Sequence, residues 1–165
     1  MATLAPLPAL SATDTVNGER RVRRTHVAIV HARYIDAMLR GEKTIEARLS
    51  RSRIAPFGRV GVGDAIWFKA SGGAFGAMAR AARVEQFEGL TPRGVRGLRA
   101  RFDAGVRADV AFWALKRSAR CATLIWLEDV REINEGPDYN ARPGDRRAWF
   151  VLDAGSRGPS LRRAG

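Results

Sequence analysis

Gly41-Glu42-Lys43-Thr44-Ile45-Glu46-Ala47-Arg48 joins a predicted helix to a predicted strand and places four charged side chains within eight residues. The preceding residues, 33–40, carry apolar side chains at helical spacing, and Gly41 follows them as a C-terminal stop. From residue 44 to 49, apolar and polar residues alternate, as in a strand with one buried face. Its apolar face holds Ile45, Ala47 and Leu49, and its other face holds Thr44, Glu46 and Arg48. We therefore expect a core on one side of this strand and a polar site on the other.

The flanking sequence predicts further strands at residues 26–31, 65–70, 75–88, 121–133 and 146–153. Two helices precede the last two strands. Thr91 and Pro92 provide an N-cap and a first-turn proline for the first helix, which Gly105 is expected to end, and residues 109–118 form the second. Because strands and helices do not alternate regularly, the predicted fold class is α+β, a small mixed β-barrel of five or six strands with flanking helices.

The composition favours a soluble globular protein with a polyanionic partner. Of its 165 residues, 45% are hydrophobic and 28% charged, and the net charge is +12. No apolar run approaches the roughly 20 residues needed to span a bilayer, and the first residues lack the leading basic region of a signal peptide. Cys121 is the single cysteine, so an intrachain disulfide is excluded and a cytoplasmic location is expected. A monomer is favoured.

Both ends of the chain are predicted to be flexible basic arms, at residues 1–24 and 154–165, around one domain at 25–153. Residues 1–25 hold four arginines against two acids, and residues 154–165 hold three arginines and no acid. Seven of the twelve net positive charges therefore fall on residues 26–153. Arginine supplies nearly all of this charge, since Lys43, Lys69 and Lys116 are the only lysines, and such rare residues draw attention as possible site residues.

The spacing Gly41-x-Lys43-x-x-Glu46-x-Arg48 directly after a helix resembles the signature of the ASCH domain family, relatives of the PUA fold. Three further segments, in the same order along the chain, look like bacterial members of that family. They are residues 63–73, which lead a strand into Ser71-Gly72-Gly73; residues 87–92, which open the helical insert; and residues 112–127, which close it. The resemblance covers about residues 25–153, and all three lysines fall within these segments. It implies a β-barrel domain that recognises RNA or a modified nucleoside.

The predicted ligand-binding residues are Lys43, Thr44, Glu46, Arg48, Lys69, Ser71, Gly72 and Gly73. Lys43 offers three donors for a phosphate or a base carbonyl, and Glu46 can accept from an exocyclic amine. Arg48 can hold Glu46 in an ion pair or grip a phosphate, and that ion pair could equally serve only to seal one end of the barrel. Lys69 and Ser71 are expected to enter from the neighbouring strand and its turn, beside the open backbone amides of Gly72 and Gly73.

An alternative function is a small hydrolase, either an amidohydrolase acting on N4-acylcytidine or a ribonuclease. The family resemblance then implies Lys43 as general base, with Glu46 and Thr44 as further candidate catalytic residues. In the amidohydrolase members a threonine nucleophile stands three residues after that lysine, where this chain has Glu46. A carboxylate from the helical insert is also expected in those enzymes, with Asp103 and Asp109 as candidates.

Other chemistry is disfavoured by the residues available. His26 and His31 are the only histidines and face opposite sides of a strand, so neither a metal site nor another cofactor is expected. Cys121 lacks a neighbouring base and is not expected to act as a nucleophile. The four tryptophans are assigned to the core, which leaves Tyr34 and Tyr139 as candidates for base stacking.

Overall fold

The structure, a computed structural model, describes residues 13–16 and 19–152. Six strands form one mixed sheet in the order β4-β7-β6-β5-β3-β8. Their bounds are Thr25–Val30 (β3), Ile45–Ser50 (β4), Ala65–Ala70 (β5), Phe75–Glu88 (β6), Cys121–Glu132 (β7) and Trp149–Leu152 (β8). The helices are Ala32–Leu39 (α1), Pro92–Val106 (α2) and Val110–Leu115 (α3). These elements confirm the predicted α+β class and most of the predicted strand positions.

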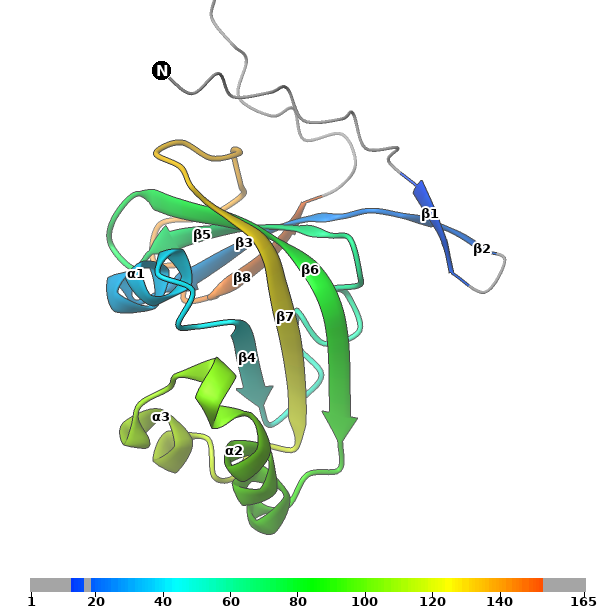
Figure 1. Ribbon diagram of the computed structural model, residues 1–165, viewed down its shortest axis with the longest axis vertical. Coiled ribbons are helices and arrows are strands. Elements are labelled where there is room, and N and C mark those ends of the chain that lie inside the picture. Colours follow the sequence, from blue (N-terminus) through cyan, green and yellow to red (C-terminus); the bar gives the residue numbers. More distant parts are fainter. Residues whose placement is uncertain (1–12, 17–18, 153–165) are drawn as a thin grey trace, which may run out of the picture.

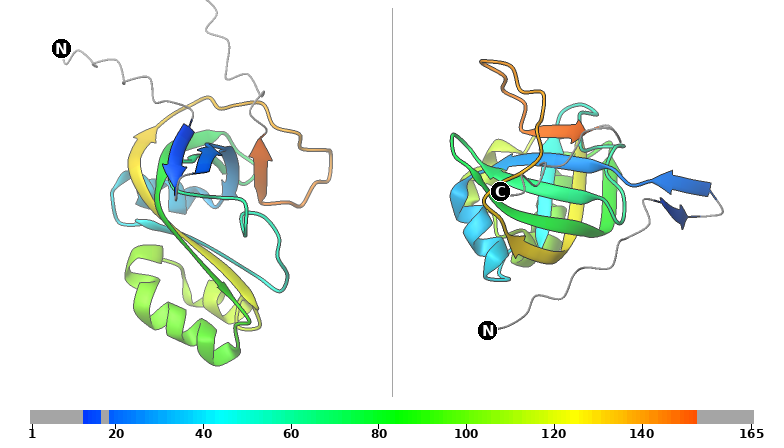
Figure 2. Two further views of the ribbon diagram at one scale, coloured as in Figure 1. Left: turned by 90° about the vertical axis from the view of Figure 1, so that its right-hand side faces the viewer. Right: turned by 90° about the horizontal axis from the view of Figure 1, so that it is seen from above.

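The sheet is antiparallel except for the pair β3 and β5, which run parallel and are joined by a crossover that contains α1 and β4. It curves into a half-barrel, seen from above in Figure 2. β6 and β7 are its longest strands, and they extend beyond the barrel to the layer formed by α2 and α3 (Figure 1). β4 pairs with this extended part of β7, in register from Ile45 opposite Trp126 to Ser50 opposite Cys121. The motif strand therefore lies between the barrel and the helical insert.

Strand alternation divides the core into two main clusters. Ala28, Ile66, Phe68 and Ile125 point into the barrel, and α1 adds Ile35 and Met38 to the same cluster. The predicted apolar face of β4 packs instead against the helical insert, where Ile45, Ala47 and Leu49 meet Val95, Leu98 and Trp113. Both faces of β4 are thus covered, which explains why Glu46 on the opposite face is also buried.

The helical insert begins with the expected capping groups, but its first helix ends differently from the prediction. The Thr91 side chain accepts a hydrogen bond from the Gly94 amide, and Pro92 occupies the first turn of α2. The prediction that Gly105 breaks this helix is wrong, because α2 continues to Val106 and ends at Arg107 in the left-handed conformation. Gly105 serves for close packing: a Cβ there would lie 2.7 Å from Cδ1 of Ile45 and 2.9 Å from Oγ1 of Thr44.

The segment predicted as an irregular N-terminal arm contains a β-hairpin, formed by Thr13–Val16 (β1) and Glu19–Val22 (β2). It projects away from the six-stranded sheet (Figure 1). The hairpin is connected to the domain by Arg21, whose guanidinium binds the buried carboxylate of Asp64 through two hydrogen bonds of 2.8 and 2.7 Å. The predicted arm at 154–165 lies outside the described residues.

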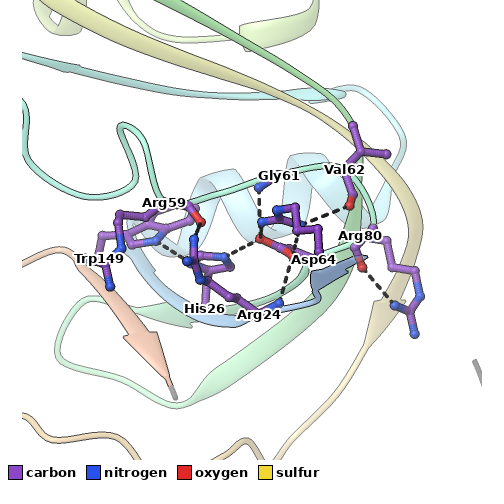
Figure 3. A network of polar contacts seen from close by, with 10 residues as sticks. Arg24, His26, Arg59, Gly61, Val62, Asp64, Arg80 and Trp149 are labelled. Carbon is purple, nitrogen blue, oxygen red and sulfur yellow. Dashed lines mark hydrogen bonds and ion pairs between the residues drawn. The ribbon is translucent and has the colours of Figure 1, made fainter. Parts of the chain in front are cut away.

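Asp64 is the centre of a buried polar network at this end of the barrel (Figure 3). Besides Arg21, it accepts hydrogen bonds from the backbone amides of Arg24 and Gly61 and contacts Nε2 of His26 at 2.9 Å. The other ring nitrogen of His26 accepts from Nε1 of Trp149, which can only donate. We therefore assign His26 as the neutral tautomer with its hydrogen on Nε2, pointing at Asp64. Each member of this network is already hydrogen-bonded within the fold, so its role is structural.

Candidate functional site

Lys43 is held where α1, α2 and β4 meet, and its side chain is only 4% exposed. The turn after α1 passes through Gly41 with φ of +73°, and the backbone amide of Lys43 donates to the Ala37 carbonyl of that helix. Its ammonium donates to the carbonyls of Ile45 and Val106 at 2.8 Å each. Val106 is the last residue of α2, where carbonyls lack intrahelical partners and the helix dipole favours a cation. Lys43 therefore caps α2 from the turn just before β4.

Glu46 lies between Lys43 and Arg48. One carboxylate oxygen accepts from Nε of Arg48 at 2.7 Å, and the other lies 3.4 Å from Nζ of Lys43. Burial by itself raises the pKa of Glu46, but the charges and hydrogen bonds of Arg48 and Lys43 outweigh it and hold that pKa below its usual range. The carboxylate is therefore ionised at neutral pH. Burial has the larger influence on Lys43 and lowers its pKa, with Glu46 opposing the shift.

Arg48 spans the open side of the half-barrel. The strands β4 and β8 are the two edges of the sheet. From β4, the Arg48 guanidinium donates to the Ala148 carbonyl, just before β8, at 3.2 Å and to the Ile29 carbonyl of β3 at 3.1 Å. It also lies over the Trp149 ring, 5.1 Å from the centroid. A side chain thus closes a gap that no strand pairing closes among the described residues.

A pocket of about 200 Å³ opens above this ion cluster, between β3, β4 and the helical insert. Lys43, Glu46 and Arg48 contribute its charged wall. Its rim includes Tyr34 from α1 and Phe112 from α3, so aromatic rings border the charges. The remaining lining residues are Ile29, Val30, His31, Ala47, Leu49, Val106, Ala108 and Lys116. A charged wall with aromatic sides suits a small planar polar ligand.

Of the eight predicted ligand-binding residues, Lys43, Glu46 and Arg48 therefore lie together at this pocket, and the other five lie elsewhere. The residues that line this pocket do not include Thr44, Lys69, Ser71, Gly72 or Gly73. The expectation that Lys69 and Ser71 enter from a strand next to β4 is wrong, because β5 pairs with β3 and β6 whereas β4 pairs with β7. Lys69 lies opposite Ile29 and on the same strand face as Trp67, both of which pack in a cluster outside the barrel core. Thr44 is exposed and packs beside Gly105.

The candidate carboxylates of the helical insert do not line the pocket either. Asp103 accepts a hydrogen bond from Nε1 of Trp113 at 2.8 Å, and Asp109 caps α3 and pairs with Arg33 at 2.5 Å. Both residues border a neighbouring surface depression instead. Among the described residues that line the pocket, Glu46 is the single carboxylate.

Sequence reasoning missed His31, Phe112 and Lys116 as pocket residues. The scarcity of lysine nevertheless singles out Lys116 in the sequence, and Tyr34 is one of the two residues predicted to stack on a base. His31 and Phe112 could not be predicted, because they are far apart in the chain and α1 and α3 meet at the pocket only in the tertiary fold. Tyr139, the other stacking candidate, packs against Phe75 and Phe150 away from the pocket.

Within the described part of the chain, no group of three or more His, Cys, Asp or Glu residues is placed to hold a metal ion. Cys121 is a buried residue at the start of β7. None of the helices in the described ranges has the length and apolar character required to cross a membrane.

Comparison with known proteins identifies the fold. No family model and no curated protein matches the chain. Crystal structures of the ASCH protein of Zymomonas mobilis do resemble it. A serine-to-alanine variant has a TM-score of 0.57 at 19% identity, covering 80% of this chain and 90% of that chain. A tyrosine-to-phenylalanine variant has a TM-score of 0.52 at 21% identity, covering 68% and 76%. The chain therefore has the fold of an ASCH domain, as the motif resemblance predicted.

Proposed function

We propose that the protein binds RNA and holds one of its bases, or a modified nucleoside, in the pocket above Lys43, Glu46 and Arg48. The observation that carries the proposal is the buried, ionised carboxylate of Glu46 at the wall of an open pocket. A nucleobase offers amino and ring N–H donors on one edge and a flat π face on each side. The pocket offers a matching acceptor in Glu46 and the rings of Tyr34 and Phe112.

Glu46 has hydrogen-bonding capacity left for a ligand. A carboxylate can accept about four hydrogen bonds, and each oxygen of Glu46 faces one cation among the described residues. The two cations fix the carboxylate in place, so a ligand does not have to order it on binding. A donor on the ligand therefore meets a preorganised, desolvated acceptor, which favours bases that present an amino group.

The surrounding charge favours a nucleic acid over a neutral metabolite. The chain carries +12, and seven of these charges lie on residues 26–153. Cations in such excess attract phosphates and release the counterions bound to them, which strengthens binding without sequence preference. The pocket then supplies the selectivity that this attraction lacks.

The proposal predicts that Glu46→Gln weakens binding and removes base preference. A hydrogen bond to a charged group contributes about 1.5–3 kcal/mol, so we expect a loss of roughly tenfold to hundredfold in affinity for the preferred base. The measurement is a fluorescence titration of short single-stranded RNAs of each base composition at low salt. Glu42→Gln is the matched control. It removes the same charge, but from a surface residue that pairs with Arg40 and Arg107.

Two outcomes contradict this function. One is an absence of RNA and nucleoside binding by the folded protein at low salt. The other is an equal change of affinity in Glu46→Gln and Glu42→Gln, which would show that Glu46 has no role in binding beyond its contribution to the net charge. Thermal unfolding of each variant shows whether a loss of binding reflects a loss of fold.

Hydrolysis is the second candidate, and the burial that lowers the pKa of Lys43 is the observation that favours it. A lysine base must be neutral, however, and the Lys43 ammonium already faces two carbonyls and a carboxylate. A neutral amine has two N–H donors, so losing the proton would leave one of these three acceptors facing the nitrogen lone pair. Incubation with N4-acetylcytidine tests the candidate directly, since release of cytidine that stops in Lys43→Met, with the variant still folded, would establish it. Absence of turnover by wild-type protein removes it.

A further inference from the structure

A second, smaller pocket of about 130 Å³ adjoins the first and shares Arg48, Leu49 and Lys116 with it. The remaining wall comes from the loop after β4, from Thr123 of β7 and from Ala148 and Trp149. Ile54 in that loop is 59% exposed, so the apolar part of the wall reaches the surface. Among the described residues that line this pocket there are two cations and no carboxylate. Its lining therefore carries two positive charges without a carboxylate to offset either of them, whereas Glu46 offsets part of the charge in the first pocket.

Thr123 gives this pocket an unused polar group. It is 1% exposed, and its hydroxyl has no hydrogen-bond partner among the residues that the structure describes. Thr123 lies directly opposite Arg48 in the β4–β7 ladder, so the two side chains point to the same face of the sheet. A buried hydroxyl without a partner costs roughly as much as a lost hydrogen bond, and such groups are uncommon in folded proteins.

The two cations also have donors to spare. Lys116 follows α3 as its C-cap and is partly buried, and the part of the chain described here offers its ammonium no acidic partner. Burial lowers the pKa of Lys116, and the nearby charge of Arg48 lowers it further. Arg48 uses three of its five N–H donors, on Glu46, Ala148 and Ile29. An anion in this pocket would relieve the repulsion between the two cations and give the Thr123 hydroxyl an acceptor.

We infer that the second pocket is an anion subsite for a phosphate group of the nucleotide whose base occupies the first pocket. Arg48 belongs to both pockets, so one guanidinium would position the base-binding carboxylate on one side and the phosphate on the other. This inference deepens the proposed function and rests on it for the identity of the ligand. The ligand class becomes a nucleotide or an RNA phosphodiester, in preference to a free nucleoside.

Inorganic phosphate is the first probe, because it tests the subsite without any base. Added to the full-length protein, it is expected to shift the backbone amide signals of Thr123 and of the loop containing Ile54. Lys116→Met is expected to weaken phosphate binding roughly tenfold, by loss of one charge-assisted contact. Lys69→Met is the matched control, since it removes the same charge from a strand face outside the barrel and should bind as wild type does.

Thr123→Val supplies a test that separates a ligand role from a packing role. It replaces the unpartnered hydroxyl by a methyl group of similar size. If the hydroxyl serves an anion, the variant binds phosphate several-fold more weakly and yet unfolds at a higher temperature, because a buried polar group without a partner has been removed. Unchanged phosphate binding in both Thr123→Val and Lys116→Met overturns the inference, as does an equal effect of Lys69→Met.

The second probe compares cytidine with its 3′- and 5′-monophosphates. A monophosphate that binds at least tenfold more tightly than cytidine, with the advantage lost in Lys116→Met, supports the subsite. If cytidine and its monophosphates bind equally and phosphate does not bind, the subsite is wrong while base recognition stands. If phosphate binds with the expected variant pattern and cytidine does not bind at all, base recognition is wrong while the anion subsite stands.

Discussion

At the scale of single residues, the two buried carboxylates, Asp64 and Glu46, differ in how much hydrogen-bonding capacity the fold leaves unused. Asp64 receives Arg21, two backbone amides and the imidazole of His26, so its acceptor sites are occupied by the fold. Glu46 receives two cations and faces an open pocket. This difference gives Asp64 a structural role and leaves Glu46 available for the binding role that we propose.

Asp64 should make stability depend on pH. Burial raises its pKa, but the hydrogen bonds from His26, Arg21 and the two amides prevail and hold that pKa far below its usual range. A depressed carboxyl pKa in the folded state stabilises the protein above the unfolded-state pKa of about 3.9. This contribution is complete above roughly pH 5 and declines as the pH falls below that. Wild-type protein should therefore lose free energy of unfolding progressively in acid, as urea titrations at several pH values would show.

Asp64→Asn isolates this effect. The variant should be less stable at pH 7 by about 2–4 kcal/mol, because Arg21 and His26 lose their charged partner, and its stability should depend less on pH in acid. Asp138→Asn, at an exposed carboxylate, is the control and should retain the wild-type pH dependence. Parallel pH profiles for Asp64→Asn and wild type would show that Asp64 is not the group responsible.

The ion cluster yields a second prediction at this scale, because Lys43 caps α2 as well as facing the pocket. Lys43→Met should lower the free energy of unfolding by about 3–5 kcal/mol, since it leaves a buried carboxylate with one cation and a helix end without its cap. Circular dichroism during thermal unfolding measures the change. A Lys43→Met protein as stable as wild type would mean that Lys43 does not stabilise the fold. That result would favour the alternative role of Lys43 as the general base of a hydrolase.

At the scale of secondary structure, the site depends on how closely α2 approaches β4. Gly105 permits this approach, and it lies next to Val106, whose carbonyl receives the Lys43 ammonium. Gly105→Ala inserts a methyl group against Ile45 and should cost about 1–3 kcal/mol through overpacking, while RNA affinity falls because Lys43 and Glu46 shift. Gly97→Ala on the same helix is the control. A Cβ at Gly97 meets no atom within 4 Å among the described residues, so that change should stabilise the protein by up to about 1 kcal/mol.

The elements themselves were largely readable from the sequence, because each depends on local signals. Alternation at β4, the glycine after α1 and the Thr91-Pro92 start of α2 all predicted what the structure shows. The hairpin β1–β2 was missed because its strands are only four residues each and lack an apolar pattern. The position of Gly105 was misread because propensity alone cannot distinguish a glycine that ends a helix from one that lets another element pack closely.

Pairings between distant strands were not readable, and they account for the errors in the site. Nothing near β4 indicates that its neighbour is β7, some 75 residues later in the chain, and not β5. This pairing moves Lys69 and Ser71 away from Glu46 and brings in Thr123 and Lys116 instead. Lys43, Glu46 and Arg48 were correctly predicted to be neighbours, because they lie within six residues of one another at the beginning of a single strand.

At the scale of the whole molecule, binding to RNA should depend on the total charge and on salt. Each phosphate neutralised on a single strand contributes about −0.7 to the slope of log K against log salt. Residues 154–165 carry Arg157, Arg162 and Arg163 and no acid, so deleting them lowers the net charge from +12 to +9. If all three arginines contact phosphate, the slope should become shallower by about 2. Affinity at low salt should fall, while the base preference that we propose for Glu46 stays the same.

The C-terminal deletion is a cleaner test of long-range charge than removal of the N-terminal segment. Deleting residues 1–24 would also remove Arg21 and so break the network around Asp64, which would confuse lost charge with lost stability. A full-length variant with lysine at positions 157, 162 and 163 is the matched control, because it preserves the charge and should keep the salt slope. If the deletion leaves the slope unchanged, the phosphate contacts lie entirely on residues 1–153. The neighbouring pockets that share Arg48 would then account for a larger part of the affinity, and Lys116→Met should by itself make the slope shallower by about 0.7.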